Sequence, residues 1–158
     1  MKLVLLLAIA FFTTQTIAFE SFDAESNKVT QNIGCIKPKF NGASPGWGRL
    51  YSCIGGKEET VKIFTNEESD IKNKVKNVKF LWNDYTKNIG YGIHADAAIA
   101  KAWAASVATM YAPLQVEKVL KVFKSKKSTI IESENYILKY TYSVGPAIDE
   151  RMFVITKK

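Results

Sequence analysis

The sequence is poor in the residue types on which most enzyme and metal sites depend. Among its 158 residues there is one histidine, His94, and there are two cysteines, Cys35 and Cys53. A single histidine offers only one base for the familiar catalytic triads. Two thiols with one distant imidazole do not make a four-ligand zinc set of recognised spacing. We therefore expect no metal site and no cofactor.

The sequence motifs of common enzyme classes are also missing. There is no G-x-S-x-G, no H-E-x-x-H and no phosphate-binding P-loop. Residues 90–95 do fit the dinucleotide pattern G-x-G-x-x-A, but that pattern has meaning only directly after a strand and inside a βαβ unit. The preceding predicted strand ends near residue 82. These absences favour a protein without catalytic activity but do not exclude an enzyme.

Long apolar runs are limited to one segment at the N-terminus. Residues 3–12 are all apolar, Lys2 precedes them, and residues 16–18 place small side chains where signal peptidase reads the chain. This pattern predicts a cleavable secretory signal over residues 1–18. The run is shorter than the roughly 20 residues of a membrane span. We therefore expect a secreted or periplasmic protein without stable membrane insertion after cleavage.

Secretion would expose the two cysteines to an oxidising compartment, where such a pair usually bonds. The sequence therefore predicts a disulfide between Cys35 and Cys53. On the chain-entropy estimate, closing a loop of this size stabilises the fold by about 3 kcal/mol.

The remaining chain has the length of one domain. Residues 19–28 are polar and lack apolar periodicity, which predicts a flexible leader, and residues 29–158 are expected to form a single α+β domain. Alternating residues at 49–54 and 60–65 predict a hairpin around Gly55-Gly56. The acidic segment 66–70 resembles a helix N-terminus, so a short helix is expected before a strand at 78–82.

Two helices and three strands are predicted for the C-terminal part. Apolar residues with helical spacing fall at 99–111 and 116–123, and alternating residues fall at 128–132, 136–144 and 152–156. The tyrosines of the second of these strands are expected to pack under a helix, and residues 149–151 to form a loop with a surface ion pair. The fold class is therefore α+β: an antiparallel sheet with a pair of helices packed on one face.

The segment that leads into the first of these helices contains the candidate polar site. Tyr91 and His94 lie at its mouth, and Asp96 is placed to cap the first turn. A helix start explains the glycines and Asp96 without any activity. Alternatively, His94 is a general base oriented by Asp84 or Asp96, because such a base needs a carboxylate within hydrogen-bond reach.

Two further features concern binding. Trp47 lies in a glycine-rich loop between the two cysteines, where a disulfide would reduce the entropy lost on binding. The lysines at 118–127 offer a cationic face to an anionic partner, although an ordinary solvated surface is the favoured explanation.

The formal net charge of +7 is compatible both with an anionic partner and with a charged surface that is only solvated. The leading hypothesis is a small secreted or periplasmic, non-catalytic binding protein: an inhibitor, an immunity-type factor or an envelope accessory factor. The alternative is a small extracytoplasmic hydrolase that uses His94 as its base. The expected partner is another protein, with an anionic envelope component as the second choice, and nucleic acid is not expected because aromatic residues do not alternate with the basic ones.

Overall fold

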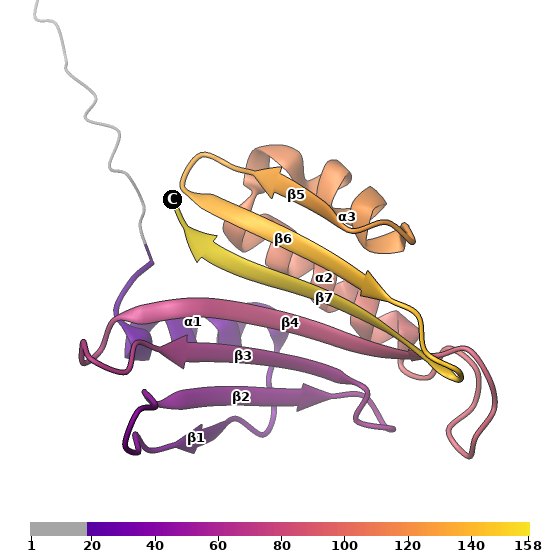
Figure 1. Cartoon of the computed structure of the whole chain (residues 1–158), viewed down its shortest axis with the longest axis horizontal. Coiled ribbons are helices and arrows are strands. Elements are labelled where there is room, and N and C mark those ends of the chain that lie inside the picture. The colour runs from indigo at the N-terminus through magenta and orange to yellow at the C-terminus, as the bar shows by residue number, and fades with distance from the viewer. Residues whose placement is uncertain (1–18) are drawn as a thin grey trace, which may run out of the picture.

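The strands of the protein form one antiparallel sheet. The computed structural model describes residues 19–158, so the predicted signal segment lies outside the described residues. Within the described part, seven strands are ordered β1-β2-β3-β4-β7-β6-β5 (Figure 1). Their bounds are β1 Lys39–Asn41, β2 Leu50–Gly55, β3 Val61–Glu67, β4 Val75–Tyr85, β5 Thr129–Glu132, β6 Tyr136–Ser143 and β7 Ile148–Lys157. The pairing of β4 with β7 joins the two halves of the sheet.

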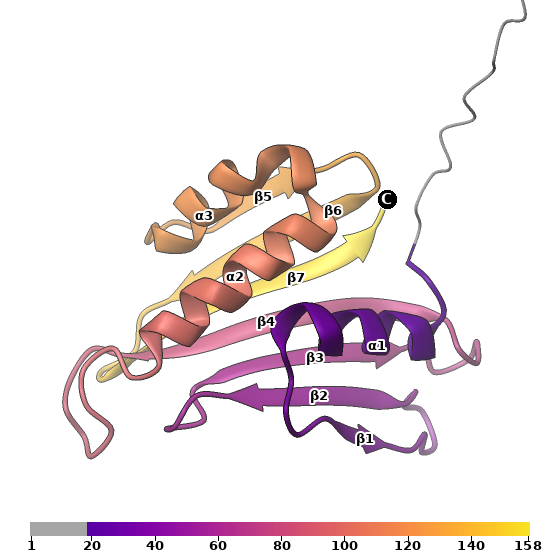
Figure 2. The same ribbon diagram turned by 180° about the vertical axis from the view of Figure 1, so that it is seen from behind.

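The helices lie on one face of this sheet. They are α1 Phe22–Ile33, α2 Ala97–Tyr111 and α3 Val116–Lys124, with a 3-10 turn, η1 Pro113–Gln115, between the last two. Figure 1 views the sheet from the side that carries no helix, with the helices behind it, and Figure 2 views the same molecule from the helical side. The predicted α+β fold is therefore confirmed, with α1 as a helix that the sequence interpretation did not include.

The core lies between the helices and the sheet and is largely aromatic. Phe123 of α3 packs against Phe80, Trp82 and Phe153, with ring centroids 5.5, 5.9 and 6.2 Å apart. Tyr140 of β6 packs on Phe153 at 5.0 Å. Most of the predicted apolar stripes of α2 and α3 and of the inward face of β6 is thus confirmed as core, where burying an aromatic side chain removes 150–250 Å² from water. Ile99 and Val144, which were predicted to belong to these faces, are exposed.

The first part of the described chain differs from its prediction. Residues 19–28 were expected to form a leader without regular structure, but α1 begins at Phe22, with Ser21 as its N-cap and Gly34 as a left-handed C-cap. The segment looked too polar because one of its buried residues is Glu25. Tyr111 Oη donates to Glu25 Oε1 at 2.6 Å, and Lys28 Nζ lies 3.2 Å from the same oxygen, so the core accommodates this carboxylate through a tertiary contact.

The predicted disulfide is confirmed. Cys35 and Cys53 are bonded, with their Cα atoms 6.1 Å apart. The bond connects the segment that follows α1 to the middle of β2, a strand on the same side of the molecule as α1. It therefore holds α1 and the β1 edge of the sheet together, far from β5 and β6.

The expected short helix after residue 66 is wrong. β3 continues to Glu67, a tight connection follows, and β4 starts at Val75. The carboxylate of Glu67 accepts hydrogen bonds from Arg49 N, Nε and Nη2 at 2.9, 3.0 and 2.8 Å. An acid that resembled a helix-start residue in the sequence is therefore the buried partner of an arginine on β2's N-terminal side.

Candidate functional site at the entrance to helix α2

The loop between β4 and α2 folds back over the end of β4. The backbone N–H of His94 donates to Tyr85 O at 2.7 Å, and the indole Nε1 of Trp82 donates to Ala95 O at 3.1 Å. His94 has φ 55°, in the left-handed region that is uncommon outside glycine and that asparagine, aspartate and histidine enter more often than other residues. The loop therefore holds His94 in a strained backbone conformation immediately before α2.

Asp96 stands at the N-cap position but does not cap the helix. Its φ is 57° and its side chain makes no capping hydrogen bond, because capping requires an extended backbone at this residue. Its carboxylate instead accepts from Lys57 N at 2.9 Å, Glu58 N at 3.1 Å and Thr60 Oγ1 at 3.1 Å. The prediction that Asp96 caps α2 is therefore wrong. Its side chain instead connects the β2–β3 turn to the start of α2.

His94 is held by a buried carboxylate. Its Nδ1 lies 2.7 Å from Asp84 Oδ1, and its side chain is 59 % exposed while that of Asp84 is 2 % exposed. A carboxylate accepts, so the ring donates from Nδ1 and leaves Nε2 on the exposed side. Of the two carboxylates considered from the sequence, Asp84 is therefore the one that orients His94.

Arg151 also contacts the His94–Asp84 pair, through the carboxylate of Asp84. Its Nε donates to Asp84 Oδ2 at 3.2 Å, and its Nη1 donates to Phe123 O and Ser125 O, each at 3.0 Å. These carbonyls belong to the end of α3, where partial negative charge gathers. Arg151 thus links Asp84 to α3 and fixes the carboxylate in place.

The prediction of a loop with a surface ion pair at residues 149–151 is also wrong. β7 starts at Ile148, and Asp149 and Arg151 are both buried on the helical face of the sheet. Asp149 accepts a very short hydrogen bond from Tyr142 Oη. Burial and this bond raise the pKa of Tyr142 to about 12, so the phenol stays protonated and donates. These charged side chains are buried because each has a polar partner there, Tyr142 for Asp149 and Asp84 for Arg151.

These residues line a hollow between α2, α3 and the sheet. Its volume is about 260 Å³. The lining residues are Trp82, Asp84, His94, Ala97, Lys101, Phe123, Lys124 and Arg151. Lys101 and Lys124 are exposed, and within residues 19–158 neither has a carboxylate within 4 Å of its Nζ. Because Arg151 balances Asp84, the hollow as a whole is positively charged. It contains no serine, threonine or cysteine that a base could activate.

The other predicted site residues lie elsewhere. Tyr91 packs on Tyr85, with ring centroids 4.9 Å apart, and does not line the hollow. Trp47 lines a hollow near the start of β4 that Asn77 also lines. Asp84 is seven residues further along that strand, which is roughly 23 Å at 3.3 Å per residue. Trp47 and His94 therefore occupy opposite ends of the sheet.

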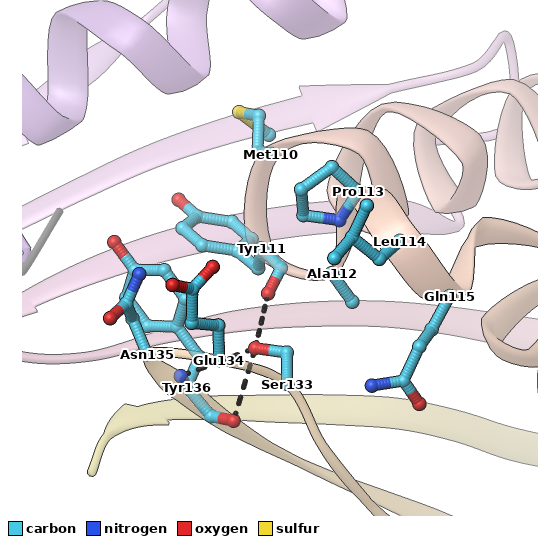
Figure 3. A pocket seen from close by; sticks show the side chains of 10 residues that line it. All are labelled: Met110, Tyr111, Ala112, Pro113, Leu114, Gln115, Ser133, Glu134, Asn135 and Tyr136. Atoms are coloured by element: carbon cyan, nitrogen blue, oxygen red, sulfur yellow. Dashed lines mark hydrogen bonds between the residues drawn. The ribbon is translucent and has the colours of Figure 1, made fainter. Parts of the chain in front are cut away.

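A second, smaller cavity of about 150 Å³ lies between the end of α2 and the β5–β6 turn (Figure 3). Ser133 Oγ donates to Tyr111 O at 2.7 Å across it, which closes the helix end. Its lining residues include no histidine, lysine or arginine. We place the functional site at the hollow beside His94 because a buried carboxylate there orients an exposed imidazole next to two lysines that have no carboxylate partner.

Sequence reasoning named His94 and Asp84, placed Lys124 in a cationic stretch and Arg151 in a loop, and missed Lys101. The signal for Arg151 was present, since Asp149, Arg151, Phe153 and Ile155 alternate and all point to the helical face. Lys101 gave no signal, because only the packing of α2 against α3 brings it to one rim with Lys124.

Comparisons with protein families, with curated proteins and with solved structures find no match to this chain. Among the described residues, no helix has both the length and the apolar character to cross a membrane. The same residues contain no cluster of three or more side chains of the kind that hold a metal ion.

Proposed function

We propose that the protein is a non-catalytic binding protein whose hollow at the entrance to α2 takes an anionic group of its ligand: a phosphate, a sulfate or a carboxylate. The observation that carries this proposal is the placement of His94 Nε2, Lys101 and Lys124 around one opening, with the acid among them already paired to Arg151. Lys101 and Lys124 each offer charged donors, and His94, whose Nδ1–H is used by Asp84, adds a donor at Nε2 in its imidazolium form.

The geometry supports binding in two ways. Asp84 fixes the ring of His94, so little side-chain entropy is lost when a ligand is bound, and charge-assisted hydrogen bonds contribute roughly 1.5–3 kcal/mol each. The volume of about 260 Å³ lies below the range of about 300–1,000 Å³ that encloses drug-sized molecules. The hollow therefore suits one anionic substituent of a larger ligand.

The test is a titration with inorganic phosphate, sulfate and acetate, followed by amide NMR. We expect saturable shifts at His94, Lys101 and Lys124. The double variant Lys101→Gln/Lys124→Gln should weaken phosphate binding by at least about tenfold, because it removes two charge-assisted donors. The matched control, Lys121→Gln/Lys126→Gln, removes the same charge outside the hollow and should bind as the wild type does. Equal weakening in both variants would reduce the effect to general electrostatics and reject the site.

A hydrolase is the second candidate, and the 2.7 Å contact between His94 and Asp84 favours it. In that case His94 would act as a general base on water, because the hollow offers no side-chain nucleophile. Panels of chromogenic phosphate and carboxylate esters test it. Turnover that is lost in His94→Asn, with phosphate binding through Lys101 and Lys124 retained, would establish the hydrolase. Phosphate binding without turnover of any ester supports the binding protein.

The proposed place of action is outside the cytoplasm. The Cys35–Cys53 bond supports this, since disulfides persist in oxidising compartments. Expression of the full chain in a secreting host, followed by mass spectrometry of the secreted product, tests it. We expect a mature N-terminus at Phe19, and a product that stays in the cytoplasm with its first residues intact would contradict the proposal.

A further inference from the structure

The face of the sheet that carries no helix has an unusual pattern of side chains. Strand pairing places seven residues in one row across all seven strands, in the order Lys39, Ser52, Phe64, Lys79, Val154, Lys139 and Ile130. A parallel row contains Ile54, Lys62, Leu81, Met152 and Thr141. We call these two rows the bare face, which is turned toward the viewer in Figure 1.

The bare face combines lysines with apolar side chains and has no acid in either row, while Glu150 and Glu132 lie on the same side of the sheet in the neighbouring rows. Its charged residues are Lys39, Lys62, Lys79 and Lys139. Within the described residues, none of these lysines has a carboxylate within 4 Å. Phe64, Leu81, Met152 and Val154 lie between them and are only partly exposed. The lysine stems cover this apolar floor and keep their ammonium groups outward.

Exposed aromatic and aliphatic residues lie at the two ends of the bare face. Trp47, which is 74 % exposed, borders a hollow that Leu50 and Lys79 also line. At the other end, Tyr91 packs on Tyr85, which follows Asn83 and Leu81 on the bare side of β4. Ile89 in the same loop is exposed as well.

We propose that the bare face docks on the surface of an anionic phospholipid bilayer, with the lysines toward the headgroup phosphates and with Trp47 and the Ile89–Tyr91 loop as anchors in the interface. Tryptophan and tyrosine prefer the headgroup level, and basic residues are attracted by about 1 kcal/mol each near an anionic leaflet. A second copy of the chain is a poor occupant, because it would set lysine rows against lysine rows.

The arrangement also differs from a protein–protein interface. Those interfaces concentrate aromatic anchors at the centre and are depleted of lysine there, with charge at the rim. Here lysines occupy the centre and the exposed aromatics lie at the ends. That inverse pattern fits a surface that rests on headgroups without deep insertion.

Co-sedimentation with lipid vesicles tests the proposal. We expect binding to vesicles of phosphatidylcholine with about 30 % phosphatidylglycerol, little binding to pure phosphatidylcholine, and a decrease as salt rises. Lys62→Gln/Lys79→Gln/Lys139→Gln should reduce the partition coefficient by about 100-fold, about fivefold for each lysine. The matched control, Lys118→Gln/Lys121→Gln/Lys126→Gln, removes the same charge from α3 and the turn after it and should change binding little.

A fluorescence measurement on the wild-type protein provides a second test that does not depend on the lysine variants. Of the three tryptophans, Trp82 and Trp103 are buried and only Trp47 is exposed, so vesicles with brominated lipid tails should quench Trp47 selectively. Trp47→Phe should remove that quenching. Absence of binding to anionic vesicles, equal losses in the two triple variants, or bound protein with Trp47 unquenched would each overturn the proposal. The first of these results would leave an acidic protein as the occupant of this face.

Discussion

Glu67 with Arg49 and Asp84 with Arg151 are two carboxylate–arginine pairs that lie at opposite ends of the sheet. Glu67 accepts three hydrogen bonds from Arg49 and one from Asn73 N, so its capacity is used entirely within the fold. Asp84 accepts one bond from Arg151 and one from His94, whose ring faces outward. The first pair is explained by folding alone, whereas the second also holds an exposed group in a defined orientation.

Replacing Arg151 is expected to produce the largest loss of stability. Arg151→Met would leave Asp84 charged, buried and without its main partner, and would release the carbonyls of Phe123 and Ser125. Breaking a buried pair in this way costs about 3–5 kcal/mol. Urea unfolding at pH 7 measures it. Arg49→Met serves as the comparison and should cost less, since the Arg49 side chain is 29 % exposed. A loss below about 1 kcal/mol for Arg151→Met would show that Asp84 does not depend on it.

Replacing Glu67 is expected to have a smaller effect that depends on pH. Hydrogen bonds from Arg49 lower the pKa of Glu67 from 4.5 to about 2. A carboxyl whose pKa is lowered by folding stabilises the native state above its unfolded value and loses that contribution as pH falls through the folded value. Glu67→Gln should therefore cost roughly 2–3 kcal/mol at pH 7, and the deficit should shrink between pH 4.5 and 2. Denaturation across that range measures it, and a deficit independent of pH would contradict the pairing.

Patterns that repeat locally were predictable from the sequence, and those that depend on tertiary partners were not. The stripe of Trp103 and Val107 and the alternation of Leu138 and Tyr140 identify helices and strands because one face is apolar throughout. α1 was missed because Glu25 interrupts its buried stripe, and that residue is stabilised there by Tyr111, 86 positions away.

The candidate site shows the same division. His94 attracted attention as the only histidine, and Asp84 was named as one of two carboxylates near it in sequence. Choosing Asp84 over Asp96 required the fold, because Asp96 follows His94 closely yet faces the β2–β3 turn. A pairing between strands β4 and β7 brings Arg151 to Asp84, and no local pattern encodes that.

The smallest change in stability and the sharpest change in binding are expected at His94. His94→Asn keeps a residue that tolerates φ 55° and removes the ring that Asp84 holds. Because the ring is mostly exposed, its bond to Asp84 is worth about 1 kcal/mol or less, and unfolding should show a change of that size.

Phosphate affinity, in contrast, should fall by about tenfold in His94→Asn at a pH where the ring is protonated, because only the imidazolium adds an Nε2–H donor to those of the two lysines. His94→Gly separates the backbone from the side chain. Glycine adopts a positive φ without a Cβ penalty, so relief of strain of about 1 kcal/mol should offset the lost contact and leave stability close to that of the wild type, while phosphate binding is weakened as in His94→Asn. If strain and the contact with Asp84 offset each other in this way, folding stability gives no reason for a histidine at position 94, and the proposed binding role supplies one. Unchanged phosphate affinity in both variants would place His94 with Glu67 among the residues that serve the fold alone.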